Sequence, residues 1–116
     1  QLGGYTSANS MQAKERFAAL YRERLPEYSL RTDVSLEEIY APSELRSWLK
    51  APDFMFVRED GSPLLAVILA DKNRVKSGVV RSLKRKGIPA IRFFVDMTNY
   101  ESYVVGRTYD TLKKYA

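Results

Sequence analysis

The most distinctive chemical pattern in this chain is the segment 72–92, which holds eight basic side chains and no acidic one. The rest of the 116 residues carry 11 basic and 14 acidic side chains, so this segment accounts for the whole net charge of +5. A clustered basic segment is the electrostatic signature of a polyanion partner, above all nucleic acid. Seven of its side chains are the predicted nucleic-acid contacts: Lys72, Arg74, Lys76, Arg81, Lys84, Arg85 and Lys86.

A solvated amphipathic helix is the alternative interpretation of the same segment. Lysine and arginine near the C-terminal end of a helix interact favourably with the helix dipole, which accounts for Lys84–Lys86. This does not account for the lack of any acidic residue between positions 72 and 92. Nucleic acid is therefore the preferred partner, bound through phosphate contacts that position the protein without reading base sequence.

The chain contains neither histidine nor cysteine, and this narrows its chemistry. The commonest general base, serine–histidine catalytic triads, thiolate metal sites and disulfides are all excluded. No apolar run is long enough to span a membrane and no secretory leader is visible, so a cytoplasmic protein without a membrane partner is expected.

Three apolar runs, two before the basic segment and one that overlaps its end, predict the strands that position it. They are Phe54–Val57, Leu64–Ala70 and Ile88–Val95. The pair Asp60-Gly61 between the first two runs predicts a β-hairpin, because glycine adopts a positive φ at little cost. Apolar residues at helical spacing between the last two runs predict a helix, and two strands joined by a helix are expected to be parallel.

The chain as a whole is predicted to form a single domain at 10–116, preceded by a flexible arm at 1–9. An apolar stripe predicts a helix over Met11–Arg24, and alternating polarity predicts a strand over Tyr28–Val34.

A capping box at Ser35–Glu38 predicts a short helix. Apolar residues from Tyr100 to Leu112 indicate a terminal helix interrupted at Gly106, with a short strand at 102–105 as the alternative.

This order of elements resembles the αβββαβ core of the PD-(D/E)xK nucleases, which is the restriction-endonuclease-like α/β fold with a central mixed sheet flanked by helices. Short motifs also resemble a bacterial family of uncharacterised nuclease-like domains. These motifs are Lys14–Phe17, Val34–Leu36, Asp53-Phe54, Pro63–Asp71 and Gly87–Arg92.

The resemblance implies a nuclease site from which one essential acid is missing. The family has an Asp at the start of the second strand, here Asp53, and a Glu-x-Lys near the end of the third, here Leu69-Ala70-Asp71. Mg²⁺ requires oxygen ligands, and the side chain of Leu69 supplies none. The following helix carries no acid that could substitute.

Three hypotheses about function follow. The first is a catalytically degenerate domain that binds nucleic acid, with duplex DNA as the expected ligand and no cofactor. The second is an active Mg²⁺-dependent deoxyribonuclease, in which Asp53 and Asp71 bind the metal while Lys72 and Glu15 complete a makeshift site for phosphodiester hydrolysis. The third is an interaction domain whose basic helix docks on an acidic protein or on the rest of a longer chain.

The two aspartates also have a purely structural interpretation. Asp53 is then expected to accept a hydrogen bond from nearby backbone, and Asp71 to cap the basic helix, whose dipole favours a negative charge at its start.

Overall fold

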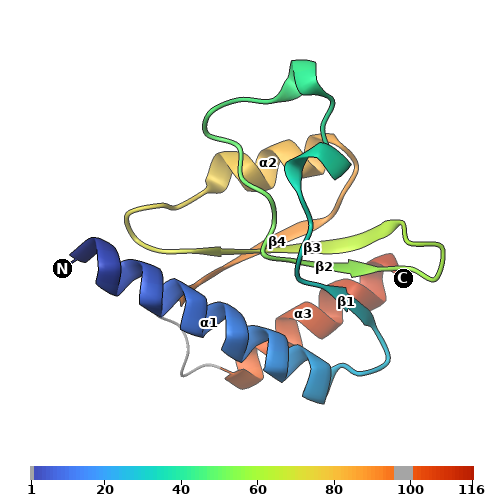
Figure 1. The fold of residues 1–116 in the computed structure, drawn as a ribbon. Coiled ribbons are helices and arrows are strands. Elements are labelled where there is room, and N and C mark those ends of the chain that lie inside the picture. The colour runs from blue at the N-terminus through green and yellow to red at the C-terminus, as the bar shows by residue number, and fades with distance from the viewer. Residues whose placement is uncertain (1, 96–100) are drawn as a thin grey trace.

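The protein is an α/β domain with one four-stranded mixed sheet and helices on both of its faces (Figure 1). The structure, a computed structural model, describes the backbone of residues 2–95 and 101–116 and the side chains of these residues from Met11 onwards. Its elements are α1 (Leu2–Arg24), β1 (Ser29–Arg31), β2 (Phe54–Val57), β3 (Pro63–Ala70), α2 (Ser77–Arg85), β4 (Ala90–Phe94) and α3 (Glu101–Tyr115), with short 3₁₀ turns at Leu36–Glu38 and Pro42–Glu44.

The strands lie in the order β1-β2-β3-β4, so each strand is next to its neighbour in sequence. β1 with β2 and β2 with β3 are antiparallel, whereas β3 and β4 are parallel and are connected through α2. The predicted hairpin is confirmed, and its Gly61 has a φ of +85°, a conformation that glycine adopts without strain. The predicted parallel pair is confirmed as well.

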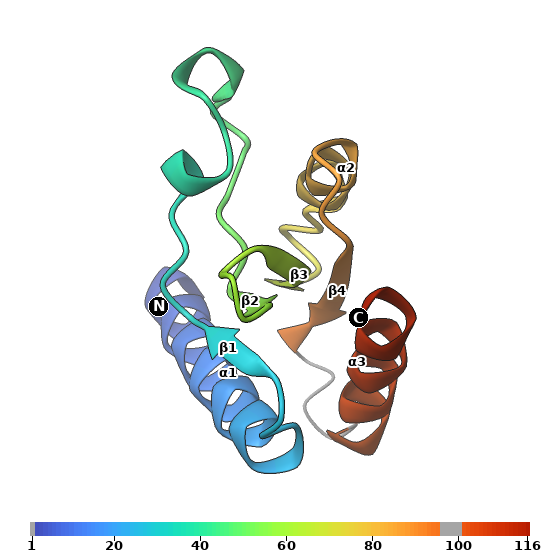
Figure 2. The ribbon, with the colours of Figure 1, turned by 90° about the vertical axis from the view of Figure 1, so that its right-hand side faces the viewer.

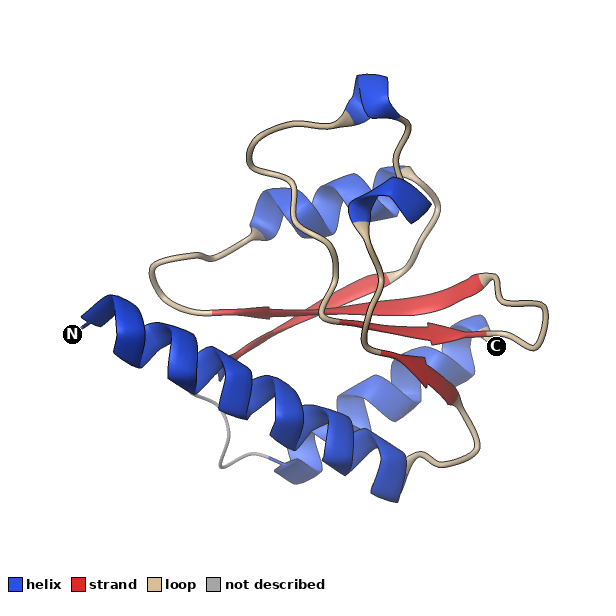
Figure 3. Ribbon diagram, in the orientation of Figure 1, coloured by secondary structure: helices blue, strands red, loops and turns tan. Residues whose placement is uncertain are grey.

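Both faces of β3 are buried, and helices therefore cover both sides of the sheet. Leu65, Val67 and Leu69 pack in one cluster with residues of α1 and α3. Ala66 and Ile68 point the other way, into a cluster with α2 and with the segment 34–49. Figure 2 shows the resulting layers, with α1 and α3 below the sheet and α2 above it, and Figure 3 shows the two 3₁₀ turns on the side of α2.

α1 and α3 are joined beneath the sheet by a buried polar contact within an aromatic cluster. The Thr108 hydroxyl donates to the Val104 carbonyl at 2.7 Å, so the Tyr21 hydroxyl must donate to Thr108, at 3.0 Å. The Tyr21 ring meets those of Phe54 and Phe56 edge to face. Burial raises the pKa of Tyr21 well above its ordinary value, and its hydrogen bond to Thr108 offsets only part of that effect.

Two element boundaries differ from those predicted. α1 begins at Leu2 rather than Met11, so the backbone of residues 2–9 is helical. No proline interrupts this stretch, and its two glycines each disfavour a helix by only about 1 kcal/mol. The first strand covers only Ser29–Arg31 of the predicted Tyr28–Val34, because the chain leaves β2 after three pairs.

The terminal helix is confirmed. It includes positions 102–105, for which a strand was the alternative, and it continues through Gly106. Tyr100 lies outside the described residues. None of the helices in the described part of the chain could cross a lipid bilayer.

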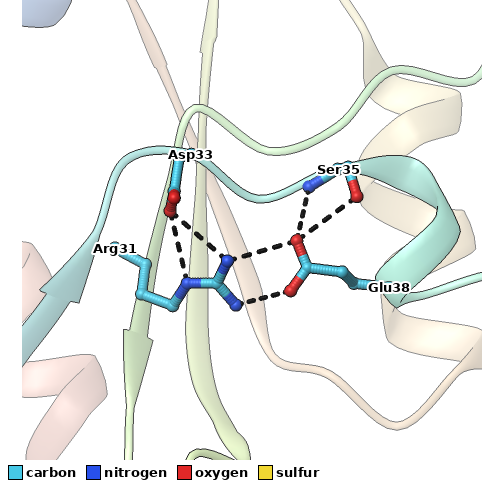
Figure 4. Close-up of polar contacts among 4 residues, drawn as sticks. All are labelled: Arg31, Asp33, Ser35 and Glu38. Carbon is cyan, nitrogen blue, oxygen red and sulfur yellow. Dashed lines mark hydrogen bonds and ion pairs between the residues drawn. The ribbon is translucent and has the colours of Figure 1, made fainter.

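The chain turns from β1 into the first 3₁₀ turn around one guanidinium group (Figure 4). Arg31 donates to both oxygens of Glu38, at 2.6 and 3.2 Å, and also contacts Asp33 at 3.3 Å. Glu38 in turn accepts the backbone N–H of Ser35 at 2.9 Å, which is the glutamate half of the predicted capping box. The hydrogen bonds from Arg31 and then from Ser35 lower the pKa of Glu38 to about 2.

We predict that this contact makes the fold sensitive to acid between about pH 4.5 and about pH 2. The ordinary pKa of Glu38 is 4.5 and its folded value is about 2, so its stabilising effect is complete above the first value and is lost as pH falls through the second. Melting temperatures measured from pH 7 to pH 2 should fall less steeply for Glu38→Gln than for the wild type. Glu37→Gln is the control, and equal slopes for all three proteins would contradict this role.

Candidate functional site

Asp53 lies just before β2 and binds the backbone of β3. Its carboxylate accepts the Leu69 N–H at 2.7 Å, and its own N–H donates to the Val67 carbonyl at 3.0 Å. These two bonds extend the contact between β2 and β3 beyond the last strand pair. The structural interpretation of Asp53, a hydrogen bond to nearby backbone, is therefore confirmed.

Both main-chain polar groups of Leu69 bind a charged side chain. Asp53 binds its N–H, and the Lys76 ammonium donates to its carbonyl at 2.9 Å. Lys76 occupies the N-cap position of α2 with a φ of +58°, a left-handed conformation that is uncommon for residues other than glycine. The Leu69 side chain is only 5% exposed and belongs to the core cluster under α1 and α3.

Asp71 follows β3 and closes a tight turn. Its Oδ1 accepts the backbone N–H groups of Asn73 and Arg74, both at 2.8 Å. The prediction that Asp71 caps the basic helix is wrong, because the helix begins at Ser77 and Lys76 is its N-cap residue. The carboxylate is instead used by the turn between β3 and that helix.

The structure brings Asp53, Asp71 and Lys76 to the same end of the β2–β3 pair, on either side of Leu69. Glu15 is an exposed residue of α1, and Lys72 is exposed in the turn that Asp71 closes. No group of three carboxylates that could hold a metal ion is found among the described residues. Magnesium at Asp53 and Asp71 stays a prediction.

We predict that Asp53 acts on the fold through its hydrogen-bond acceptor rather than through its charge. Asp53→Ala would leave the Leu69 N–H without a partner and should lower the free energy of unfolding by about 1–3 kcal/mol. Asp53→Asn keeps an acceptor oxygen and should lose less than about 1 kcal/mol. Urea unfolding of the two variants measures both values.

Equal losses in Asp53→Ala and Asp53→Asn would contradict this role. Cleavage of plasmid DNA with Mg²⁺ or Mn²⁺, measured on the same proteins, adds an independent outcome. Metal-dependent cleavage in the wild type that Asp53→Asn abolishes would instead identify the carboxylate as a catalytic ligand.

Five basic residues of the segment 72–92 lie exposed on α2 and on the turn before it. Helix α2 buries Val79, Ser82 and Leu83, and its charged positions point away from the sheet. These five cations, which have no ion pair among the described residues, are Lys72, Arg74, Arg81, Lys84 and Arg85, called here the α2 basic face.

The other three cations of the segment make structural contacts. Lys86 forms an ion pair with Glu44 at 2.9 Å and lies over the Tyr40 ring. Arg92 donates to the Val75 carbonyl at 3.0 Å, and Lys76 binds Leu69. Two of the seven predicted contacts, Lys76 and Lys86, are thus engaged within the fold.

The segment 34–49 holds α2 in place with its basic face outward. The Tyr40 hydroxyl donates to Ser82 at 2.8 Å, next to the ion pair between Glu44 and Lys86. Sequence analysis missed Glu44 as a counter-charge because it lies 42 residues before Lys86. Its capping-box position, in which it accepts the Ala41 N–H at 2.7 Å, was the available local signal.

Comparison of the chain with protein-family models, with curated proteins and with solved structures found no match. A function is therefore proposed from the residues and geometry of this chain. The resemblance to the nuclease-like family stays a prediction.

Proposed function

We propose that this domain binds the phosphate backbone of nucleic acid, with duplex DNA as the preferred ligand, through the α2 basic face. The observation that carries this proposal is the set of five exposed cations on one helix and its preceding turn, with no carboxylate in the segment 72–92. Lysine and arginine contacts to phosphates release condensed counterions, and this supplies most of the affinity of binding that is independent of base sequence.

The cost of placing these charges together supports a ligand. Arg81 lies three residues before Lys84 and four before Arg85, so the three side chains are neighbours on the helix surface. Each like-charge pair at this spacing destabilises an isolated helix by about 0.2–0.5 kcal/mol. A bound phosphate chain would offset this repulsion.

We further propose that the scaffold is a catalytically degenerate restriction-endonuclease-like core. The order of helices and strands supports this assignment, as does the leucine at position 69, where the family that it resembles has a glutamate. An active nuclease is less well supported, because Leu69 is a core residue and both aspartates already bind backbone N–H groups.

A salt titration of DNA binding tests the proposal. If five cations pair with phosphates, log K for a duplex of about 20 base pairs should fall with log salt with a slope near −4.5. Arg81→Gln/Arg85→Gln removes two of these charges and should bring the slope to about −2.7. Fluorescence anisotropy at several salt concentrations measures both.

The matched control is Arg22→Gln/Arg24→Gln, which removes the same charge from exposed positions of α1 on the other side of the sheet. Its slope should stay near that of the wild type. A wild-type slope near zero would contradict the proposal. Equal changes in the two double variants would show that net charge, rather than the α2 basic face, drives binding.

A further inference from the structure

β4 is the last strand of the sheet, and no described strand pairs with its outer edge. The Pro89 carbonyl accepts the Ala66 N–H at 2.8 Å, so it points toward β3. Because main-chain groups alternate in direction along a strand, those of Ala90, Arg92 and Phe94 point to the open edge. Figure 2 shows this edge between α2 and α3.

Two hollows lie along this edge and have volumes of about 470 Å³ and about 410 Å³. They share four lining residues from α2, β4 and α3, and together they form one groove, called here the β4 groove. Five cations and no carboxylate line it: Arg81, Lys84, Arg92, Arg107 and Lys114.

Both long walls of the β4 groove carry positive charge. On α3, Tyr103, Arg107, Thr111 and Lys114 recur at intervals of three or four residues, so they share one side of the helix. On α2, Arg81 and Lys84 line the opposite wall. A ligand lying along β4 would therefore contact basic side chains of α2 on one side and of α3 on the other.

We propose that the β4 groove binds an extended acidic peptide, which adds a fifth strand to the sheet along β4. The open edge offers both N–H donors and carbonyl acceptors, which is what a β-strand from another chain pairs with. Acidic side chains alternate to the two sides of such a strand, where the cations of α2 and α3 lie. This site adjoins the proposed DNA contact and shares Arg81 and Lys84 with it, whereas Arg92, Arg107 and Lys114 belong to β4 and α3.

The main-chain groups favour a peptide over a nucleic-acid strand. The carbonyls of Ala90 and Arg92 have no described strand partner and can accept hydrogen bonds from a strand that lies beside β4. A DNA backbone offers phosphate acceptors and no donor, because it lacks the 2′-hydroxyl. A peptide strand offers a donor and an acceptor at every second residue.

The experiment is an amide-resolved NMR titration with an end-blocked peptide of about eight residues, in which pairs of glutamates alternate with pairs of valines so that both sides of the strand carry acids. The amides of Arg92 and Phe94 should shift and should exchange with solvent roughly tenfold more slowly when the peptide is saturating. The amides of Ile91 and Phe93, which face β3, should change little. Peptide binding without slower exchange at Arg92 and Phe94, or no binding at millimolar peptide, would overturn the proposal.

Two neighbouring lysines provide a matched pair of variants. Lys114 lines the β4 groove, whereas Lys113 lies over the Tyr109 ring outside it. Lys114→Glu should weaken peptide binding about fivefold or more, and Lys113→Glu should change it less than about twofold. Equal weakening would show that the peptide responds only to net charge, which would contradict the proposed site.

A single-stranded DNA oligonucleotide of about eight thymidines, titrated in the same way, separates the two classes of ligand. It should leave exchange at Arg92 and Phe94 unchanged. If it slows exchange at these amides and the peptide does not, the groove is assigned to nucleic acid and the peptide proposal is overturned.

Discussion

The structure depends on the burial of β3 from both sides. Residues Leu64–Ala70 are all buried. Their apolar side chains point to both faces of the sheet, so each face must be covered by other elements. One face is covered by α1 and α3, and the other by α2 with the segment 34–49. Charged groups are therefore excluded from β3 itself, and those near it lie beyond its end or on the outer sides of the helices.

The charged side chains at the end of β3 and those on the outside of α2 have different roles. At the strand end, Asp53 and Lys76 bind the backbone of Leu69, and Asp71 binds the backbone of the next turn. These carboxylates and this ammonium satisfy main-chain groups. The cations of the α2 basic face bind no main-chain group of the residues that the structure describes, which is why a ligand is proposed for them.

Sequence patterns predicted the parts of the fold that are encoded locally. The Asp60-Gly61 hairpin, the parallel pair around α2 and the terminal helix each have their signals in one continuous stretch of the sequence. The start of α1 at Leu2 was missed, because polar, glycine-containing residues carry no helical apolar pattern.

Contacts between distant segments could not be predicted in this way. Glu44 meets Lys86 across 42 residues, and Lys114 joins Arg81 along the β4 groove only because α2 and α3 lie on either side of β4. The basic cluster was visible in the sequence, but which of its members are already engaged was not. Chemical-shift mapping with a DNA duplex at low salt tests the central claim most directly. Perturbed amides confined to residues 72–85 would agree with the proposed DNA contact, whereas perturbations centred on α1, or none at all, would contradict it.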